Sequence, residues 1–288
     1  PTNNFTPLSL FAAKLQTPRV WKFLTEYRQE IFDGNFVSIS YQAAFGRDLF
    51  LTRSLFNADP NFTLVRLTNN EGSSDYHALN AIYEKRLSQR FSVAARYTLA
   101  KSVDNFSPDD GSFRQTVHVS QILSRDRAAS DFDARHQASV YAAFDVPALF
   151  EGGAAEFLTK DWTIFGFVNA RTALPVNVTY ARVNDFGVEY FRPDFISDAP
   201  LFLNETNGGG KQLNPAAFTI PVNQGQGDLA RNAVRGFAFF QTDLGLERRI
   251  NFGGETNLRL TMEVFNLFDN KNFAGMSGNL GTLNTSGE

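Results

Sequence analysis

Long stretches of strict alternation between apolar and polar residues constrain the fold of this chain most. Near the C-terminal end, four apolar side chains alternate with four polar ones: Leu258, Leu260, Met262 and Val264 against Asn257, Arg259, Thr261 and Glu263. Successive side chains of a β-strand point to opposite faces, so this pattern indicates an extended strand with one apolar and one polar side. The 30 Phe, eight Tyr and two Trp residues also favour strands. The chain is therefore expected to be all-β.

The alternation marks eight long segments that pair as four hairpins. Short turn sequences join the first, second and fourth pairs: FDGN at residues 32–35, SQR at residues 88–90 and NFGGE at residues 251–255. Gly, Asn and Asp are residues that tight turns favour. The third pair is predicted over residues 135–146 and about 158–174, joined by a segment with two adjacent glycines.

The connections between the hairpins are long and polar, at residues 46–74, 104–131 and 175–235. Loops of that length are unusual in a compact soluble domain. Short turns at one end and long loops at the other are typical of outer-membrane barrels, and strands of about 12 to 16 residues can cross a bilayer at a tilt. We expect an antiparallel up-and-down transmembrane β-barrel, here a fragment of about eight long strands with short periplasmic turns and long extracellular loops. The alternation alone also fits a soluble β-sandwich.

Composition excludes several other classes of protein. The formal net charge is -3, the pI is about 5.7 and the basic residues are scattered, so nucleic acid is not an expected partner. There is no Cys, hence no disulfide framework and no thiolate metal site. The sequence has no run of 18 apolar residues, so it does not predict a transmembrane helix. A GxSxG elbow is absent and the serines are scattered, so we do not expect an enzyme.

Six short strings, in order, carry a resemblance to a known family. They are SSDYHALN (residues 73–80), AKSVDN (100–105), FDARHQ (132–137), LNPAAF (213–218), ARNAVRGF (230–237) and MEVFNLFDNKNF (262–273). Together they resemble the TonB-dependent outer-membrane receptors, and specifically the Oar-like family. Asn266, Phe268 and Asp269 resemble the penultimate-strand motif of the wider receptor superfamily.

This resemblance implies the C-terminal part of a barrel of about 22 strands. Residues 1–288 would then form a partial barrel domain, with the plug domain, the N-terminal strands and the final C-terminal strand absent. Such a piece is not expected to insert stably alone, because the unpaired backbone groups of two sheet edges are costly in lipid. The alternative is that the eight strands close on themselves as a small barrel.

The resemblance also implies a location, partners and a function. The location would be the outer membrane of a Gram-negative bacterium. The partners would be outer-membrane lipid, the barrel-assembly machinery, an unknown extracellular ligand and the receptor's own plug. Through the plug, the receptor would also contact TonB. The function would be ligand binding and energy-coupled nutrient uptake. Two alternatives remain: adhesion or secretion by an Oar-like outer-membrane protein, and a soluble or surface β-rich carbohydrate-binding module.

Two groups of residues are candidates for contacts. Four polar residues are predicted to face the barrel lumen, where they would contact the plug or line the permeation route: Arg96, Arg135, Arg259 and Glu263. Four aromatic residues of the longest loop could stack on an extracellular ligand: Tyr180, Phe186, Tyr190 and Phe191.

No metal site or cofactor is expected from the sequence. In DFDARH, Asp133 and His136 would point to opposite faces of a strand, so they are not expected to share a metal ion. The pair Asp109 and Asp110 fits either a solvated turn or the capture of calcium by an extracellular loop.

Overall fold

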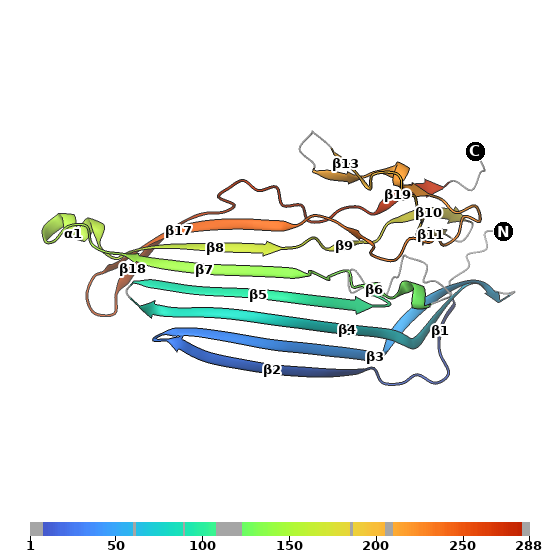
Figure 1. Cartoon of the computed structure of the whole chain (residues 1–288), viewed down its shortest axis with the longest axis horizontal. Helices are drawn as coiled ribbons and strands as arrows, with labels where there is room; N and C mark the ends of the chain where they lie inside the picture. The colour runs from blue at the N-terminus through green and yellow to red at the C-terminus, as the bar shows by residue number, and fades with distance from the viewer. Residues whose placement is uncertain are drawn as a thin grey trace.

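The computed structural model describes residues 8–59, 62–88, 90–107, 123–184, 187–204 and 210–283. Eight long strands form one antiparallel sheet whose order follows the chain (Figure 1). These are β2 (Arg19–Phe32), β3 (Asn35–Asp59), β4 (Phe62–Ser88), β5 (Phe91–Asp104), β7 (His136–Val146), β8 (Trp162–Arg171), β17 (Phe239–Asn251) and β18 (Asn257–Val264). Two short strands join them: β1 (Leu8–Phe11) beside β4 and β6 (Ala128–Ala129) beside β5. The predicted eight-strand, up-and-down arrangement is confirmed.

Three of the four predicted hairpin turns are confirmed. Phe32 pairs with Asn35, and Gly34 between them has a φ of 68°. Ser88 pairs with Phe91, and Asn251 pairs with Asn257 across a turn in which Gly253 has a φ of 93°. Positive φ angles favour glycine, which has no Cβ to clash with the backbone. We call this end of the sheet the turn end and the opposite end the loop end.

The third hairpin differs from the prediction. Residues 153–159 form the helix α1 (Gly153–Thr159), and the next strand begins at Trp162 rather than near Leu158. The segment GAAEFLT is rich in good helix formers, and the Glu156 carboxylate accepts a hydrogen bond from the Gly152 amide at 2.8 Å. A short local helix therefore replaces the start of the predicted strand.

The predicted loop over residues 46–74 is wrong, because β3 and β4 continue through it. These strands are 25 and 27 residues long and pair as far as Asp59 and Phe62. The register shifts between Gly46 and Leu49 and again between Leu49 and Leu51. A bulge moves the following side chains to the other face, so the sequence alternation is interrupted although the strand is not.

The long sheet has two chemically different faces, which follow from the register because directly paired residues share a face. One register row crosses seven strands with mainly apolar side chains: Tyr27, Ile39, Ala81, Tyr97, Ala138, Ala170 and Phe240. The adjacent row lies on the opposite face and is polar: Glu26, Ser40, Asn80, Thr98, Gln137 and Arg171. We call these the apolar face and the polar face.

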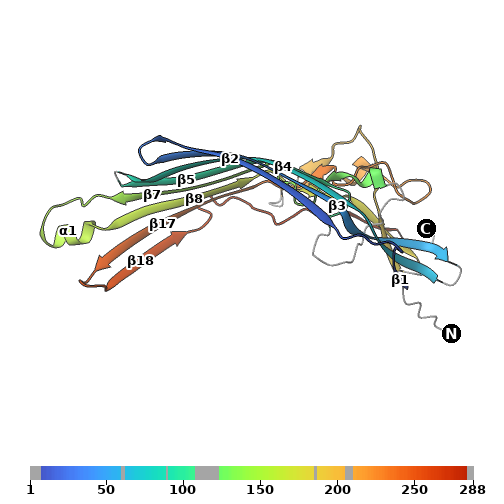
Figure 2. The same cartoon turned by 90° about the horizontal axis from the view of Figure 1, so that it is seen from below.

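The sheet is an open, curved wall (Figure 2). β2 and β18 lie at its two edges and do not pair with each other, which contradicts closure of the eight strands into a small barrel. All 14 residues of β2 and all eight of β18 are exposed, so both faces of the edge strands are uncovered. In the described part of the chain, no helix is long and apolar enough to cross a membrane.

Residues 175–235, predicted as a loop, contain small sheets. The strands are β9 (Pro175–Val176), β10 (Thr179–Asn184), β11 (Gly187–Phe191), β12 (Asp194–Phe195), β13 (Phe202–Asn204), β14 (Lys211–Leu213), β15 (Phe218–Thr219) and β16 (Val234–Arg235), and β19 (Asn279–Leu283) pairs with β10. Two 3₁₀ turns accompany them at Leu123–Asp126 and Pro215–Ala217. We call residues 175–235 together with β19 the loop module.

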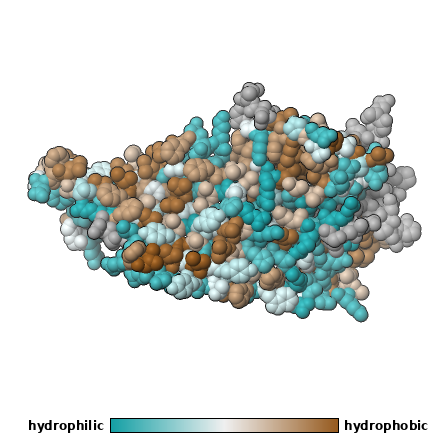
Figure 3. Space-filling model, viewed as in Figure 1, coloured by the Kyte–Doolittle hydropathy of each residue, from teal (hydrophilic) through white to brown (hydrophobic). Residues whose placement is uncertain are grey.

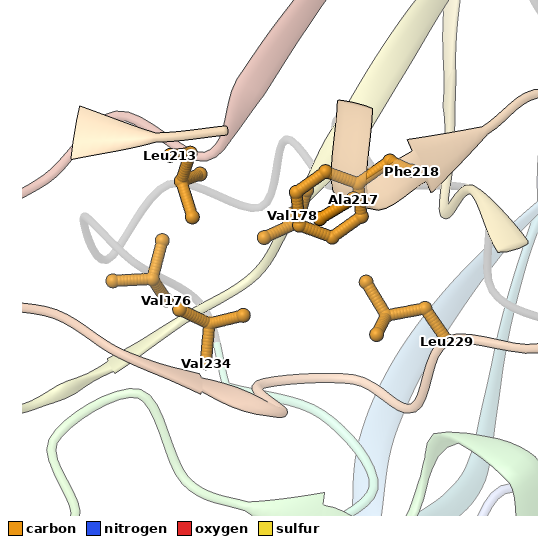
Figure 4. Close-up of a cluster of buried hydrophobic side chains, with 7 residues drawn as sticks. All are labelled: Val176, Val178, Leu213, Ala217, Phe218, Leu229 and Val234. Atoms are coloured by element: carbon orange, nitrogen blue, oxygen red, sulfur yellow. The ribbon is translucent and has the colours of Figure 1, made fainter. Parts of the chain in front are cut away.

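The loop module has its own hydrophobic core (Figure 4). Its buried members are Val176, Val178, Leu213, Ala217, Phe218, Leu229 and Val234. These side chains come from segments up to 58 positions apart along the chain, from Val176 to Val234. The module is therefore a folded unit at the loop end of the wall rather than an extended connection.

Candidate functional site

Hydrogen bonds between neighbouring strands organise the polar face. Thr98 donates to the Asn80 side-chain oxygen at 2.8 Å, and the Asn80 amide donates to the Ser40 hydroxyl at 3.4 Å. On the same face, Arg28 pairs with Glu84 at 2.8 Å. The polar groups of this face are thus arranged in a ladder across strands, as expected for a surface next to water or another protein. Figure 3 draws the whole molecule rather than the polar face alone, and on the surface seen there hydrophilic side chains become frequent toward the loop end.

Three of the four residues predicted to face the lumen lie on the polar face. Arg96 pairs in register with Ser139, Arg259 with Arg249, and Glu263 with Gly245. Arg135 lies just before β7, where its carbonyl accepts a hydrogen bond from the Ala100 amide at 2.9 Å. The shared face of the first three is a geometric result, whereas their contact with a plug stays a prediction.

A broad depression of about 910 Å³ lies on the polar face at the turn end. Cations and carboxylates line it together: Arg90, Lys160 and Arg249 with Asp145, Asp161, Glu247 and Glu263. Glu247 forms ion pairs with Arg249 at 3.5 Å and with Arg259 at 3.3 Å, and both arginines are about half exposed. Such a mixed, solvated charge pattern can dock a complementary protein surface.

At the loop end, Arg231 holds the loop module against the wall. Its guanidinium pairs with Asp104 of β5 and with Asp131 at 3.3 Å. The same group donates to the carbonyl oxygens of Asp126 at 2.9 Å and Asp104 at 2.8 Å. Arg231 is only 8% exposed, and a charge buried to that extent is stable only with such partners.

Two further arginines complete this arrangement, which we call the clasp. Arg235 pairs with the buried Asp133 at 2.6 Å and donates to the Asp133 carbonyl at 2.6 Å. Arg192 pairs with Asp126 at 2.7 Å, and both side chains are almost fully buried. Burial lowers the pKa of the Arg192 guanidinium, and the adjacent Asp126 carboxylate opposes that shift. The clasp therefore joins the loop module to the ends of β5 and β7.

The contacts of the clasp explain the charged residues in three of the six strings. AKSVDN supplies Asp104, FDARHQ supplies Asp133, and ARNAVRGF supplies Arg231 and Arg235. Ser102, in the first string, also donates its amide hydrogen to the Asp133 carboxylate at 2.7 Å. The sequence reasoning did not foresee this contact, because Asp104 and Arg231 lie 127 positions apart. The signal in the sequence that could have pointed to this contact was charge: two of the strings contain Asp104 and Asp133, and the third contains Arg231 and Arg235.

The LNPAAF and NLFD strings also have structural roles. In LNPAAF, the Asn214 side chain caps the 3₁₀ turn by accepting from the Ala216 amide at 3.1 Å. In NLFD, Asn266 and Asp269 have φ angles of 53° and 50°, and the Asp269 amide donates to the Asn266 carbonyl at 2.8 Å. Asn and Asp tolerate this left-handed conformation better than most residues. Phe268 is 66% exposed at this turn.

The candidate ligand-stacking aromatics have different surroundings. Tyr180 is 1% exposed and donates its hydroxyl to the Gly225 carbonyl at 2.6 Å, and burial raises the pKa of that hydroxyl. Phe191 is 5% exposed and its ring lies 5.9 Å from that of Tyr180. As arranged, these two rings pack inside the loop module and are not presented to a ligand. Tyr190 is half-buried, and Phe186 lies outside the described residues.

No metal centre is assembled in the described ranges, where no three His, Asp or Glu side chains converge. Asp133 is engaged by Arg235, whereas His136 lies on the apolar face with Tyr97, so the two residues have separate partners. Asp109 and Asp110, the candidates for calcium, lie outside the described residues. The expectation that the chain needs no cofactor stays a prediction.

The open wall, its apolar face and its polar face define the class of protein as an outer-membrane β-barrel. A family model described as an outer membrane beta barrel domain matches residues 1–288, and the chain belongs to that family. It is therefore a protein of the Gram-negative outer membrane, which contradicts the alternative of a soluble carbohydrate-binding module. A search of curated protein sequences found no match.

One solved structure supports the fold, and two others match less well. The chain is similar to the outer-membrane transporter YddB from Escherichia coli, with a TM-score of 0.57 and 13% identity over 92% of this chain and 31% of that one. It also matches FpvA of P. aeruginosa, solved with heterologous pyoverdines, at a TM-score of 0.46, 14% identity and coverage of 89% and 24%. The copper transporter OprC matches at a TM-score of 0.46, with 11% identity and coverage of 92% and 28%. The chain thus spans about a third of the length of YddB, and this likeness concerns the fold alone.

Proposed function

We propose that this chain forms part of the barrel wall and the extracellular loops of a TonB-dependent receptor of the Oar-like family, which takes up an extracellular ligand. The observation that carries the proposal is the charged depression on the polar face at the turn end. A transporter of this class needs an inner wall that can hold a plug domain and release it when energy arrives from the inner membrane. Partly exposed pairs such as Arg259–Glu247 suit that task, because ion pairs in contact with water exchange partners at little cost in free energy.

The assignment to this class is supported by three further observations. The six strings resemble that receptor family, and the clasp accounts for three of them by contacts between loop module and wall. YddB, the neighbour with the TM-score of 0.57, is described as an outer-membrane transporter. The chain matches 31% of its length, so the plug and the remaining strands would be contributed by other parts of the receptor.

The wall performs no covalent chemistry in this proposal. Its polar face would bind the plug and line the route of the ligand, while the loop module would restrict the entrance. Tyr190, which is half-buried in the loop module, and Phe186, which lies outside the described residues, remain the aromatic candidates for ligand contact. The apolar face would contact lipid, and the barrel-assembly machinery would insert the whole receptor.

Charge reversal on the polar face tests this function. In the full-length receptor, Glu263→Arg is expected to weaken plug docking on the order of tenfold and to lower ligand uptake, because it converts one of the four carboxylates that line the depression into a cation. Arg259→Glu should act in the same direction, because it replaces one of the two cationic partners of Glu247 by a like charge. Uptake is measured in cells with equal surface levels of receptor.

The matched control is Glu255→Lys, which reverses a charge at the exposed turn between β17 and β18, outside that depression. Uptake should stay at the native level in this variant. Normal uptake by Glu263→Arg and Arg259→Glu at native surface levels would argue against a plug-contacting wall, and would favour the adhesion or secretion role.

A further inference from the structure

The apolar face changes its chemistry abruptly toward the loop end. On β4, the outward side chains run from Leu79 to His77, and on β5 from Leu99 to Lys101. On β7 the corresponding outward residue is His136, which pairs in register with Leu99. Apolar side chains thus give way to nitrogen-bearing ones within two residues of the register on three neighbouring strands. In a membrane barrel, this height corresponds to the level of the lipid headgroups.

Two tyrosine–histidine pairs mark this level. The Tyr41 hydroxyl lies 2.7 Å from Nδ1 of His77, and the Tyr97 hydroxyl lies 2.6 Å from Nδ1 of His136. With the tyrosine as donor, Nδ1 accepts, so the hydrogen of the neutral imidazole resides on Nε2. In that tautomer, the Nε2 atom of each ring is a hydrogen-bond donor. Two of the three histidines of the chain occupy this repeated arrangement.

Lys101 lies between the two histidines. It is directly opposite His77 in the register and two residues beyond Leu99, the partner of His136. Paired residues have Cβ atoms about 5 Å apart and diagonal neighbours about 7 Å apart, so one tetrahedral anion can reach all three side chains. The Lys101 side chain is exposed, and it forms no ion pair among the described residues.

The neighbouring carboxylates are already occupied by other cations. Asp75, the next outward residue on β4, pairs with Arg47 at 2.7 Å and with Arg127. Asp48 pairs with Arg19. Lys101 therefore adds an uncompensated positive charge to the two imidazole rings. The surface on the turn-end side of these three residues is apolar.

We propose that Lys101, His77 and His136 bind a phosphate group of a phosphorylated glycolipid in the outer leaflet. A phosphate offers oxygen acceptors for an ammonium group and for N–H donors. The acyl chains of the same lipid would lie against the apolar side chains below, such as Leu79 and Leu99, which are 46% and 38% exposed. The cation and the apolar surface together fit an anionic lipid better than a soluble anion, which would use only the three polar groups.

Binding of lipid A to the full-length receptor in detergent tests this site. The triple variant His77→Gln, Lys101→Gln, His136→Gln removes the charge and the imidazole rings while keeping polar side chains at exposed positions. We expect the dissociation constant for lipid A to rise on the order of tenfold. Lipid A without its phosphates should bind the native receptor as weakly as intact lipid A binds the variant.

The matched control is Lys85→Gln. Lys85 lies on the same face at the turn end, where its ammonium is 5.5 Å from the centre of the Phe91 ring. This variant should bind lipid A like the native receptor, because that end faces the other leaflet. Native affinity in the triple variant, equal binding of the dephosphorylated lipid, or an equal loss in Lys85→Gln would each overturn the proposed site.

Discussion

Replacement of Arg231 by Ala is expected to release the loop module from the wall and to cost about 3 to 5 kcal/mol of local stability. The variant leaves Asp104, 3% exposed, without its guanidinium partner, and the carbonyls of Asp104 and Asp126 lose their donor. The Asp104 carboxylate would keep only the Ser107 hydroxyl as a side-chain donor, and a buried carboxylate without a cationic partner is a larger penalty than the loss of the ion pair itself. Hydrogen exchange on the full-length protein should show lost protection at residues 126–133 and 229–235.

Two variants control this prediction. Arg28→Ala removes an ion pair whose side chains are 48% and 44% exposed, so it should cost less than about 1 kcal/mol. Arg231→Lys keeps the charge but lacks the planar fork that reaches Asp104, Asp131 and the Asp126 carbonyl together, so it should restore only part of the protection. Native protection in Arg231→Ala would show that the clasp does not hold the module in place.

Val140→Arg is expected to destabilise the membrane-embedded protein by about 2 to 4 kcal/mol. Val140 lies on the apolar face in the middle of β7, in the row that contains Ala95 and Val168, and it is 36% exposed. If that face contacts lipid, an arginine there has no water and no counter-ion. The effect is measured as the change in the urea midpoint for unfolding of the full-length receptor from liposomes.

The adjacent residue provides the matched control. Ser139 lies on the polar face, paired with Arg96 and Asn169, so Ser139→Arg should change the free energy of unfolding by less than about 1 kcal/mol. The two variants add the same side chain to neighbouring positions of one strand. An equal cost at both positions, or a larger cost at Ser139, would contradict the assignment of the faces.

The alternation in the sequence was sufficient to predict the strands of the wall, because alternation is a local property of the chain. It predicted the eight strands and three of the four turns, and it placed Arg96, Arg259 and Glu263 on one side, where the register has them. Residues 46–74 were missed because the register shifts near Gly46 and Leu49 break the pattern inside a continuous hairpin. The helix α1 was missed because seven residues are too short for a clear helical period.

The clasp and the loop module could not be derived in the same way. Their contacts join residues that are distant in the sequence, such as Asp104 with Arg231 or Val176 with Val234, and no local period encodes such pairs. Tyr180 illustrates the consequence. Its sequence context suggested an exposed loop aromatic, whereas the core of the loop module and the Gly225 carbonyl bury it.

A spin-label scan of β18 reports which face of the wall contacts lipid. The chain has no Cys, so single cysteines at residues 257–264 of the full-length receptor can carry the label without interference from this segment. Collision with oxygen, which concentrates in lipid, should be high at Leu258, Leu260, Met262 and Val264. It should be low at Asn257, Arg259, Thr261 and Glu263. A reversed pattern, or the absence of a period of two, would contradict the assignment of the apolar face to lipid.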